Sequence, residues 1–182
     1  MDKSPGAGPR ARLRTGARLL VLSAVALAAV GAVGRGIGWI LLTTTLGPTA
    51  YILLAHPDTE AAQVRSSVLG HTSAAACGLA CLAAFGLWDD PSTAAHQSDN
   101  WRQICAQALA VGLTLFLLVV LKAHHPPAAA TALLITSGIA RPGPPLYGML
   151  TGLAILITTA AVLSRVPATR ARAPESPSDD KN

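Results

Sequence analysis

Charged side chains are scarce in this sequence of 182 residues, in which Lys, Arg, Asp and Glu together make up 13%. A soluble domain usually carries about a quarter of such residues. Aromatic residues are also few, at 4%, whereas hydrophobic residues reach 51%. Small and aliphatic side chains therefore dominate, and these let helices approach closely where no water drives them together. The composition excludes an ordinary soluble domain and predicts an integral membrane protein in contact with the lipid bilayer.

The sequence also lacks the signatures of most cofactor and enzyme chemistry. Its three cysteines, Cys77, Cys81 and Cys105, lie in apolar stretches, and an odd number there gives no disulfide framework. Cys77 and Cys81 share a helix face and are soft ligands, but no CxxC or HxxxH pattern accompanies them. We find no nucleotide-binding loop, GxSxG turn or paired carboxylates. We therefore expect no enzyme, no cofactor and no resident metal.

The net charge of +5 is placed at the two ends of the chain. Basic residues gather before the first apolar run, between Lys3 and Arg18, and again after the last run, from Arg165 onward. Bases that flank apolar runs set membrane topology, because cytoplasmic loops retain Lys and Arg. We therefore expect no nucleic acid partner, and we interpret residues 1–12 as a basic cytoplasmic segment.

Charged residues divide the remaining sequence into six uncharged windows. A helix needs about 20 apolar residues to cross the hydrocarbon layer; the first window reaches this length by extending back to Leu13 if its flanking arginines extend to the headgroups. We predict an all-helical polytopic bundle over residues 13–164, followed by a tail, 165–182, too polar to fold. The windows are 19–34, 36–57, 66–88, 103–121, 123–140 and 142–164.

Six crossings give a topology that agrees with the charge distribution. The N-terminus, the 56–65 loop, the turn at Lys122 and the tail then face the cytoplasm and hold eleven of the fourteen Lys and Arg residues. The opposite side receives the acidic loop after residue 88. This is the positive-inside bias of a multi-pass protein in a plasma (inner) membrane, with a cytoplasmic N-terminus. If 123–140 dips in and returns, five crossings result and the C-terminus lies outside.

Proline interrupts the second window at Pro48 and opens the fifth at Pro126 and Pro127. Because proline removes a backbone donor, and lipid tolerates free backbone groups only where protein or water covers them, we expect both segments inside the bundle. Proline is well placed in a first helical turn. Half-helices starting there would offer free N–H groups to an anion, with hydroxyl donors from Thr49 and Thr131. The alternative is two kinked packing helices without a ligand.

The two broken segments occupy equivalent places in two halves, 13–88 and 103–164. Each is the second helix of a three-helix group, and Gly70 and Gly148 each lie near the start of the third helix. Three crossings per unit would invert the second unit, and inverted repeats with two broken helices are a known transporter plan. The alternative is chance similarity between strings rich in Ala, Leu and Pro.

Four further polar residues are candidates for the same site. His125 precedes the second proline break, and His71 lies near the start of the third window. Ionisable residues in a membrane are costly and often functional, and histidine can supply a proton or stabilise an anion; the structural alternative is capping at the interface, which we prefer for His124. Gln63 and Arg65 precede the third window, where Arg65 either draws in an anion or anchors a helix end.

These candidates also carry a family resemblance. The string HPPAAATAL from His125 resembles the signature of the HPP family of integral membrane proteins, in which His-Pro-Pro is usually continued by Ala-Gly-Ala. The string GPTAYILLA from Gly47 looks like the Gly-rich segment of that family. Gln63, Arg65, Gly70 and His71 resemble a further stretch, roughly Gln-Pro-Arg-Asn followed by Gly-Gly-His. The resemblance covers about residues 15–164.

The sequence departs from the family pattern at three positions. Ala129 stands where glycine is usual, and Val64 and Ser66 replace the usual proline and asparagine. A close backbone approach at residue 129 is harder with alanine, which weakens the case for a ligand site shared there.

The resemblance implies passage of a small anion, because some plant and cyanobacterial relatives are associated with nitrite transport. It adds His125, Pro126, Pro127, Gln63, Arg65 and His71 to the half-helix candidates Pro48, Thr49 and Thr131. We hypothesise a transporter or channel for a small anion, nitrite first, in a bundle thin enough to be compatible with a homodimer. The rivals are a non-transporting scaffold or sensor and a soft-metal transporter that uses Cys77 and Cys81.

Overall fold

The computed structural model describes residues 8–96 and 100–165, and the regular structure within them is entirely helical. Four helices are long and apolar enough to cross a membrane: α1, α3, α5 and α7. This confirms the predicted all-α polytopic bundle. In chain order the elements are α1 (Pro9–Ile37), α2 (Leu46–Ala55), the 3-10 helix η1 (Glu60–Ala62), α3 (Val64–Ala84), α4 (Thr93–His96), α5 (Trp101–Val120), α6 (Ala128–Thr136) and α7 (Pro144–Arg165).

The two predicted broken segments form short helices, each preceded by non-helical chain. Helix α2 has 10 residues and α6 has 9, so they are about 15 Å and 13 Å long and span about half of the hydrocarbon layer. Residues 38–45 lead into α2 and residues 121–127 lead into α6. Each of these passes therefore consists of a stretch without regular helix followed by half a helix.

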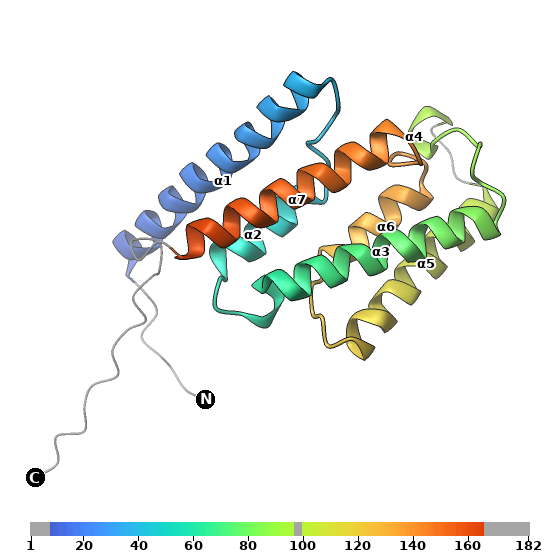
Figure 1. The fold of residues 1–182 in the computed structure, drawn as a ribbon. Helices are drawn as coiled ribbons and strands as arrows, with labels where there is room; N and C mark the ends of the chain where they lie inside the picture. The colour runs from blue at the N-terminus through green and yellow to red at the C-terminus, as the bar shows by residue number, and fades with distance from the viewer. Residues whose placement is uncertain (1–7, 97–99, 166–182) are drawn as a thin grey trace, which may run out of the picture.

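Successive passes run in opposite directions (Figure 1). Helices α1, α3 and α6 run toward one end of the bundle, and α2, α5 and α7 run back. Helix α6 continues the direction of the chain that precedes it, so the fifth segment does not dip in and return. The described residues make six passes through the bundle, and the start of α1 and the end of α7 lie toward the same end.

The helix starts follow the proline signals closely but not at every position. Pro127 is the N-cap of α6, as expected. Helix α2 begins at Leu46, so Pro48 is its third residue rather than its first. The difference is small in energy, because the first N–H groups of a helix lack intrahelical partners and a proline anywhere in the first turn removes none of its hydrogen bonds.

The packing follows the predicted 3+3 inverted repeat. The third helix of each half packs against the broken segment of the other half: α3 on α6, and α7 on α2. Glycine allows both contacts. A Cβ at Gly70 would lie 3.2 Å from the Cβ atoms of His125 and Ala128, and a Cβ at Gly148 would collide with the carbonyl oxygen of Ile40. The two glycines that the sequence placed at equivalent positions therefore serve the same purpose.

The two broken helices differ in how well the bundle covers them. Helix α6 lies centrally, since Ala128 and Ala132 pack in one apolar cluster with α3 and α5, and Ile135 packs in another with α2 and α7. Helix α2 keeps an exposed face on which the side chain of Tyr51 is 57% exposed. The expectation that both segments lie inside the bundle is therefore correct for α6 and wrong for this face of α2, because α1 covers less of it than α5 covers of α6.

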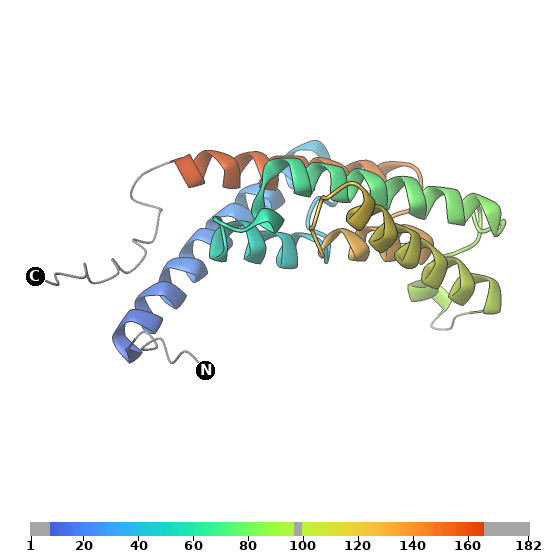
Figure 2. The ribbon, with the colours of Figure 1, turned by 90° about the horizontal axis from the view of Figure 1, so that it is seen from below.

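Helix α1 diverges from the bundle toward its N-terminal end (Figure 2). Only 11% of its most apolar window is buried, against 44% for α3. The helix starts at Pro9, four residues before the expected boundary at residue 13, since proline suits a first turn. The first residues of the predicted basic segment and the predicted tail after Arg165 lie outside the described ranges.

Candidate functional site

His71 joins the two half-helices at the centre of the site. It lies seven residues after Val64, about 10 Å along α3. Its Nε2 is 3.2 Å from the hydroxyl of Thr49 in α2, and its Nδ1 is 2.8 Å from the hydroxyl of Thr131 in α6. Both hydroxyls belong to the first turn of their helices. One imidazole therefore holds together the two helix starts that come from opposite halves of the chain.

The direction of these hydrogen bonds follows from counting donors. The hydroxyl of Thr49 donates to the carbonyl oxygen of Thr45, 2.7 Å away, so its single proton is used. Nε2 of His71 must then carry the proton and donate to Thr49. Nδ1 is left as the acceptor, and Thr131 donates to it. In this arrangement His71 is neutral and both of its ring nitrogens are satisfied.

His125 lies against His71, in the turn that leads into α6. The two rings meet edge to face with centroids 4.9 Å apart. Nδ1 of His125 is 2.7 Å from the carbonyl oxygen of Ala61 in η1, so Nδ1 must be the protonated nitrogen. The side chain is completely buried. Its Nε2 is a buried lone pair with no hydrogen-bond partner among the described residues.

Ser67 is the member of this cluster that the sequence did not single out. Its hydroxyl is buried and lies 3.3 Å from Nδ1 of His125. The signal was available, since Ser67 and His71 are four residues apart and therefore share one face of a helix. Gly70 on the same face brings the turn at His125 close enough for both contacts.

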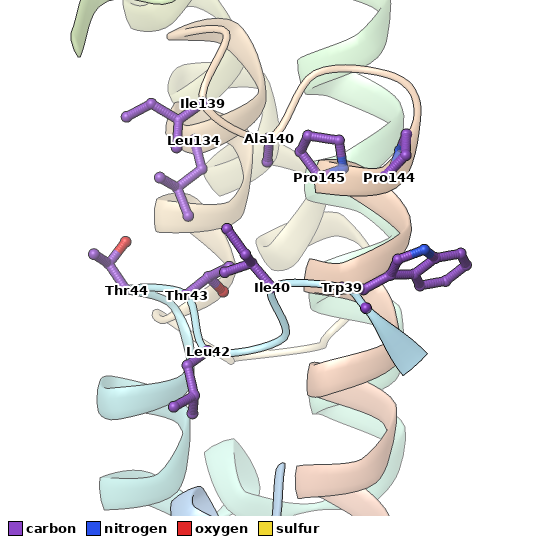
Figure 3. A pocket seen from close by; sticks show the side chains of 11 residues that line it. Trp39, Ile40, Leu42, Thr43, Thr44, Leu134, Ile139, Ala140, Pro144 and Pro145 are labelled. Carbon is purple, nitrogen blue, oxygen red and sulfur yellow. The ribbon is translucent and has the colours of Figure 1, made fainter. Parts of the chain in front are cut away.

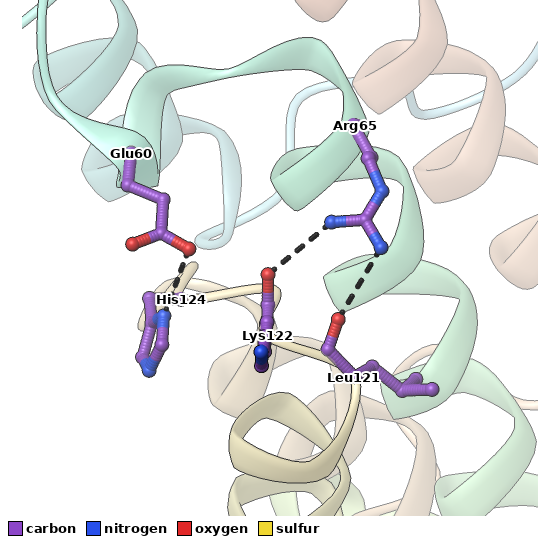
Figure 4. A network of polar contacts seen from close by, with 5 residues as sticks. All are labelled: Glu60, Arg65, Leu121, Lys122 and His124. Atoms are coloured by element: carbon purple, nitrogen blue, oxygen red, sulfur yellow. Dashed lines mark hydrogen bonds and ion pairs between the residues drawn. The ribbon is translucent and has the colours of Figure 1, made fainter.

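Gln63 and Arg65 lie away from this cluster. Gln63 is the N-cap of α3, and its side chain is exposed. The guanidinium of Arg65 donates to the carbonyl oxygens of Leu121 and Lys122, at 3.4 and 3.3 Å, at the end of α5 (Figure 4). A cation at these carbonyls complements the negative end of the helix. The structure therefore places Arg65 at a helix end, as the anchoring alternative has it.

The Arg65 contacts predict a small effect of substitution. We expect Arg65→Ala to lower the free energy of unfolding by less than about 1 kcal/mol, because the bonds are exposed and long. The anion uptake hypothesised from the sequence should stay near the wild-type rate if the side chain only anchors α5. Thermal unfolding and anion uptake of purified Arg65→Ala, beside Arg65→Lys, would check this. A loss of uptake at unchanged stability in Arg65→Ala, restored in Arg65→Lys, would show instead that the charge guides the anion.

A separate apolar pocket of about 470 Å³ opens beside residues 38–44, between the end of α6 and the start of α7 (Figure 3). Ile40, Leu42, Leu134 and Ile139 surround it. None of the polar residues that His71 joins lines this pocket. Its lining is mainly apolar, with Thr43 and Thr44 as its polar members, and it is distinct from the candidate site.

In the part of the chain that the structure describes, no three His, Cys, Asp or Glu side chains gather closely enough to hold an ion. Cys77 and Cys81 are buried and free in α3. His71 thus shares α3 with the two cysteines, but the three side chains do not form one ligand set.

The chain matches the family model described as HPP, transmembrane region, over residues 8–174. The protein belongs to the HPP family. No curated protein and no solved structure matches it. The HPP match covers all six passes, and so includes both broken segments and the histidine pair.

The His-Pro-Pro motif of the HPP family begins α6. The carbonyl oxygens of His125, Pro126 and Pro127 accept hydrogen bonds from the next three N–H groups after the prolines. Two successive prolines cost nothing here, because the N–H groups they remove would have no helical partner. His125 and Pro127 are buried, whereas Pro126 is exposed, as is Pro48 in the other half. The motif therefore sets both the start of the half-helix and the position of the buried imidazole.

Ala129, which stands where the HPP family usually has glycine, is only partly buried. Its side chain lies on α6 outside the cluster of fully buried residues that face α3. The close approach between α6 and α3 is made by Gly70 and Gly78 on α3 instead.

Proposed function

We propose that this HPP-family protein is a transporter or channel for a small anion, with nitrite as the first candidate, and that it is not an enzyme. The observation that carries the proposal is the bridge by His71 between Thr49 and Thr131 at the starts of two half-helices. Broken helices that meet inside a bundle are the usual place of a transporter's substrate site.

The chemistry of the bridge suits an anion. Both half-helices have their first turns beside His71, so their free N–H groups and the positive ends of their helix dipoles lie close to it. The hydroxyls of Thr49 and Thr131 are neutral donors, and each can rotate away from its present hydrogen bond to donate to a ligand. The family resemblance supplies nitrite as the anion to test first, because nothing in a pair of hydroxyls and imidazoles distinguishes one small anion from another.

The charged residues at the end of the bundle where α1 begins support a particular orientation in the membrane. Arg65, Lys122 and His124 lie at the end where α1 begins, beside Glu60, which is 3.1 Å from His124 (Figure 4). With the basic N-terminal residues, this end carries most of the positive charge. We propose that it faces the cytoplasm and that the protein resides in the plasma membrane.

One observation favours the rival, a scaffold or sensor that does not transport. His71, Thr49 and Thr131 are buried and already hydrogen-bonded to one another, so the polar groups of the site satisfy themselves in this conformation. A carrier must also enclose its site from both sides at one stage of its cycle. Uptake measurements therefore separate the two.

We expect saturable nitrite uptake into proteoliposomes that contain the purified protein, tested beside nitrate, chloride and empty vesicles. His125→Ala and Pro127→Leu should each lower the initial rate at least about tenfold, because one removes a buried polar group and the other the rigid start of α6. The matched control is His124→Ala, whose exposed ring should leave uptake near wild type. Normal transport by both His125→Ala and Pro127→Leu, at normal abundance, would contradict the anion site.

A further inference from the structure

An anion that enters this bundle meets no permanent positive charge. In residues 8–95 and 100–163, the buried polar side chains are hydroxyls, one glutamine and two histidines, and no Lys or Arg side chain is buried. An uncompensated charge in such surroundings costs several kcal/mol. Helix dipoles and hydroxyls reduce this cost, but among the buried side chains described only a protonated histidine can supply a full positive charge.

Only one of the two buried histidines has a nitrogen available for that proton. Both nitrogens of His71 are engaged, with Thr49 and with Thr131. His125 uses Nδ1 at the carbonyl oxygen of Ala61, and its Nε2 stays buried without a partner. The added proton therefore goes to Nε2 of His125 without the loss of an existing hydrogen bond.

We propose that the protein moves its anion together with one proton, and that Nε2 of His125 carries this proton. This rests on the proposed function. The lone pair of Nε2 forms an N–H bond with the incoming proton, and the imidazolium's positive charge balances the anion's negative charge. On release the N–H bond breaks, and anion and proton leave on the same side. No electrons are transferred, and no further reactant is needed.

The groups around His125 make the proton and the anion depend on each other. His71 on α3 is the titratable ring next to His125. Glu60 of η1 and His124 of the α5–α6 turn pair with each other at the exposed boundary. Arg65 reaches the carbonyls at the end of α5, and Lys122 is exposed; α6 has no titratable side chain. Among the described residues no carboxylate contacts His125, so the anion itself is the counter-ion that stabilises the imidazolium, and each promotes binding of the other.

The contact with His71 limits the coupling to one proton. Two imidazolium rings at 4.9 Å would repel each other. A proton on Nδ1 of His71 would also break the bond that Thr131 donates. The expected stoichiometry is therefore one proton for each monovalent anion, and transport carries no net charge.

Proteoliposome uptake of nitrite with pH and voltage set independently tests this. We expect the protein-dependent initial rate, after subtraction of empty vesicles, to rise several-fold, up to about tenfold, for an outside that is one pH unit more acidic. An inside-positive voltage at equal pH should not change it. His125→Asn keeps an N–H at the position of Nδ1 for Ala61 but has no nitrogen to protonate, and should abolish the response to pH. His124→Asn is the matched control and should respond like wild type.

Each other outcome overturns the inference. Uptake driven by the inside-positive voltage and indifferent to the pH gradient would show passage of the anion alone, so the proposed function would stand and the proton role would fall. An undiminished response to pH in His125→Asn would place the proton elsewhere. Absence of protein-dependent uptake of nitrite, nitrate and chloride would remove the proposed function and this inference together.

Discussion

Replacing His71 with alanine is expected to abolish anion uptake and to lower the free energy of unfolding by about 2–4 kcal/mol. The substitution leaves a cavity where a buried ring stood and removes the hydrogen-bond partner of Thr131. It also disconnects α2 from α6, because the ring is the polar link between Thr49 and Thr131. Uptake into proteoliposomes and thermal unfolding of the purified protein in detergent measure the two effects.

Two further variants separate the loss of polarity from the loss of volume at this position. His71→Phe keeps an aromatic ring but offers no nitrogen, so it should restore part of the stability and none of the uptake. His56→Ala removes an exposed histidine at the end of α2 and should leave both quantities near wild type. Normal uptake by His71→Phe would show that the ring serves packing alone and would remove His71 from the anion site.

Alanine at Gly148 and Gly152 together is expected to prevent accumulation of folded protein. A Cβ at these positions would collide with the carbonyl oxygens of Ile40 and Leu41. Backbone cannot rotate away as a side chain can, so α7 must separate from residues 38–45 along their length. We expect a loss of about 3 kcal/mol or more, measured as the yield of monodisperse protein and its midpoint of thermal unfolding.

The matched controls are Gly36→Ala in α1 and Gly112→Ala in α5, where nothing lies within 4 Å of the added Cβ. Alanine favours a helix over glycine by about 1 kcal/mol, so these variants should be as stable as wild type or slightly more stable. Equal stability of Gly148→Ala/Gly152→Ala and the controls would contradict the close packing of α7 against residues 38–45.

Much of the candidate site followed from the sequence because its signals are local. Proline positions indicate where a helix starts, and the residues just after a start bear its free N–H groups. Thr49 and Thr131 were therefore candidates before their partner was known. His71 and His125 stood out because ionisable side chains are rare in apolar windows. The family resemblance also made Gln63 and Arg65 candidates. Arg65 instead contacts the end of α5, and spacing in the sequence does not specify that neighbour.

The sequence by itself determined the membrane class, the two breaks and the equivalent glycines, but it left five or six passes open. Each depends on composition, window length or the backbone chemistry of Pro and Gly, all of which act over a few residues. Only the tertiary structure decided that α3 packs on α6 and α7 on α2, that His71 lies between Thr49 and Thr131, and that Nε2 of His125 has no partner. The hydrogen bonds of His71 join residues 22 and 60 positions apart. All of these facts depend on the angle and depth at which helices pack, which short-range patterns do not encode.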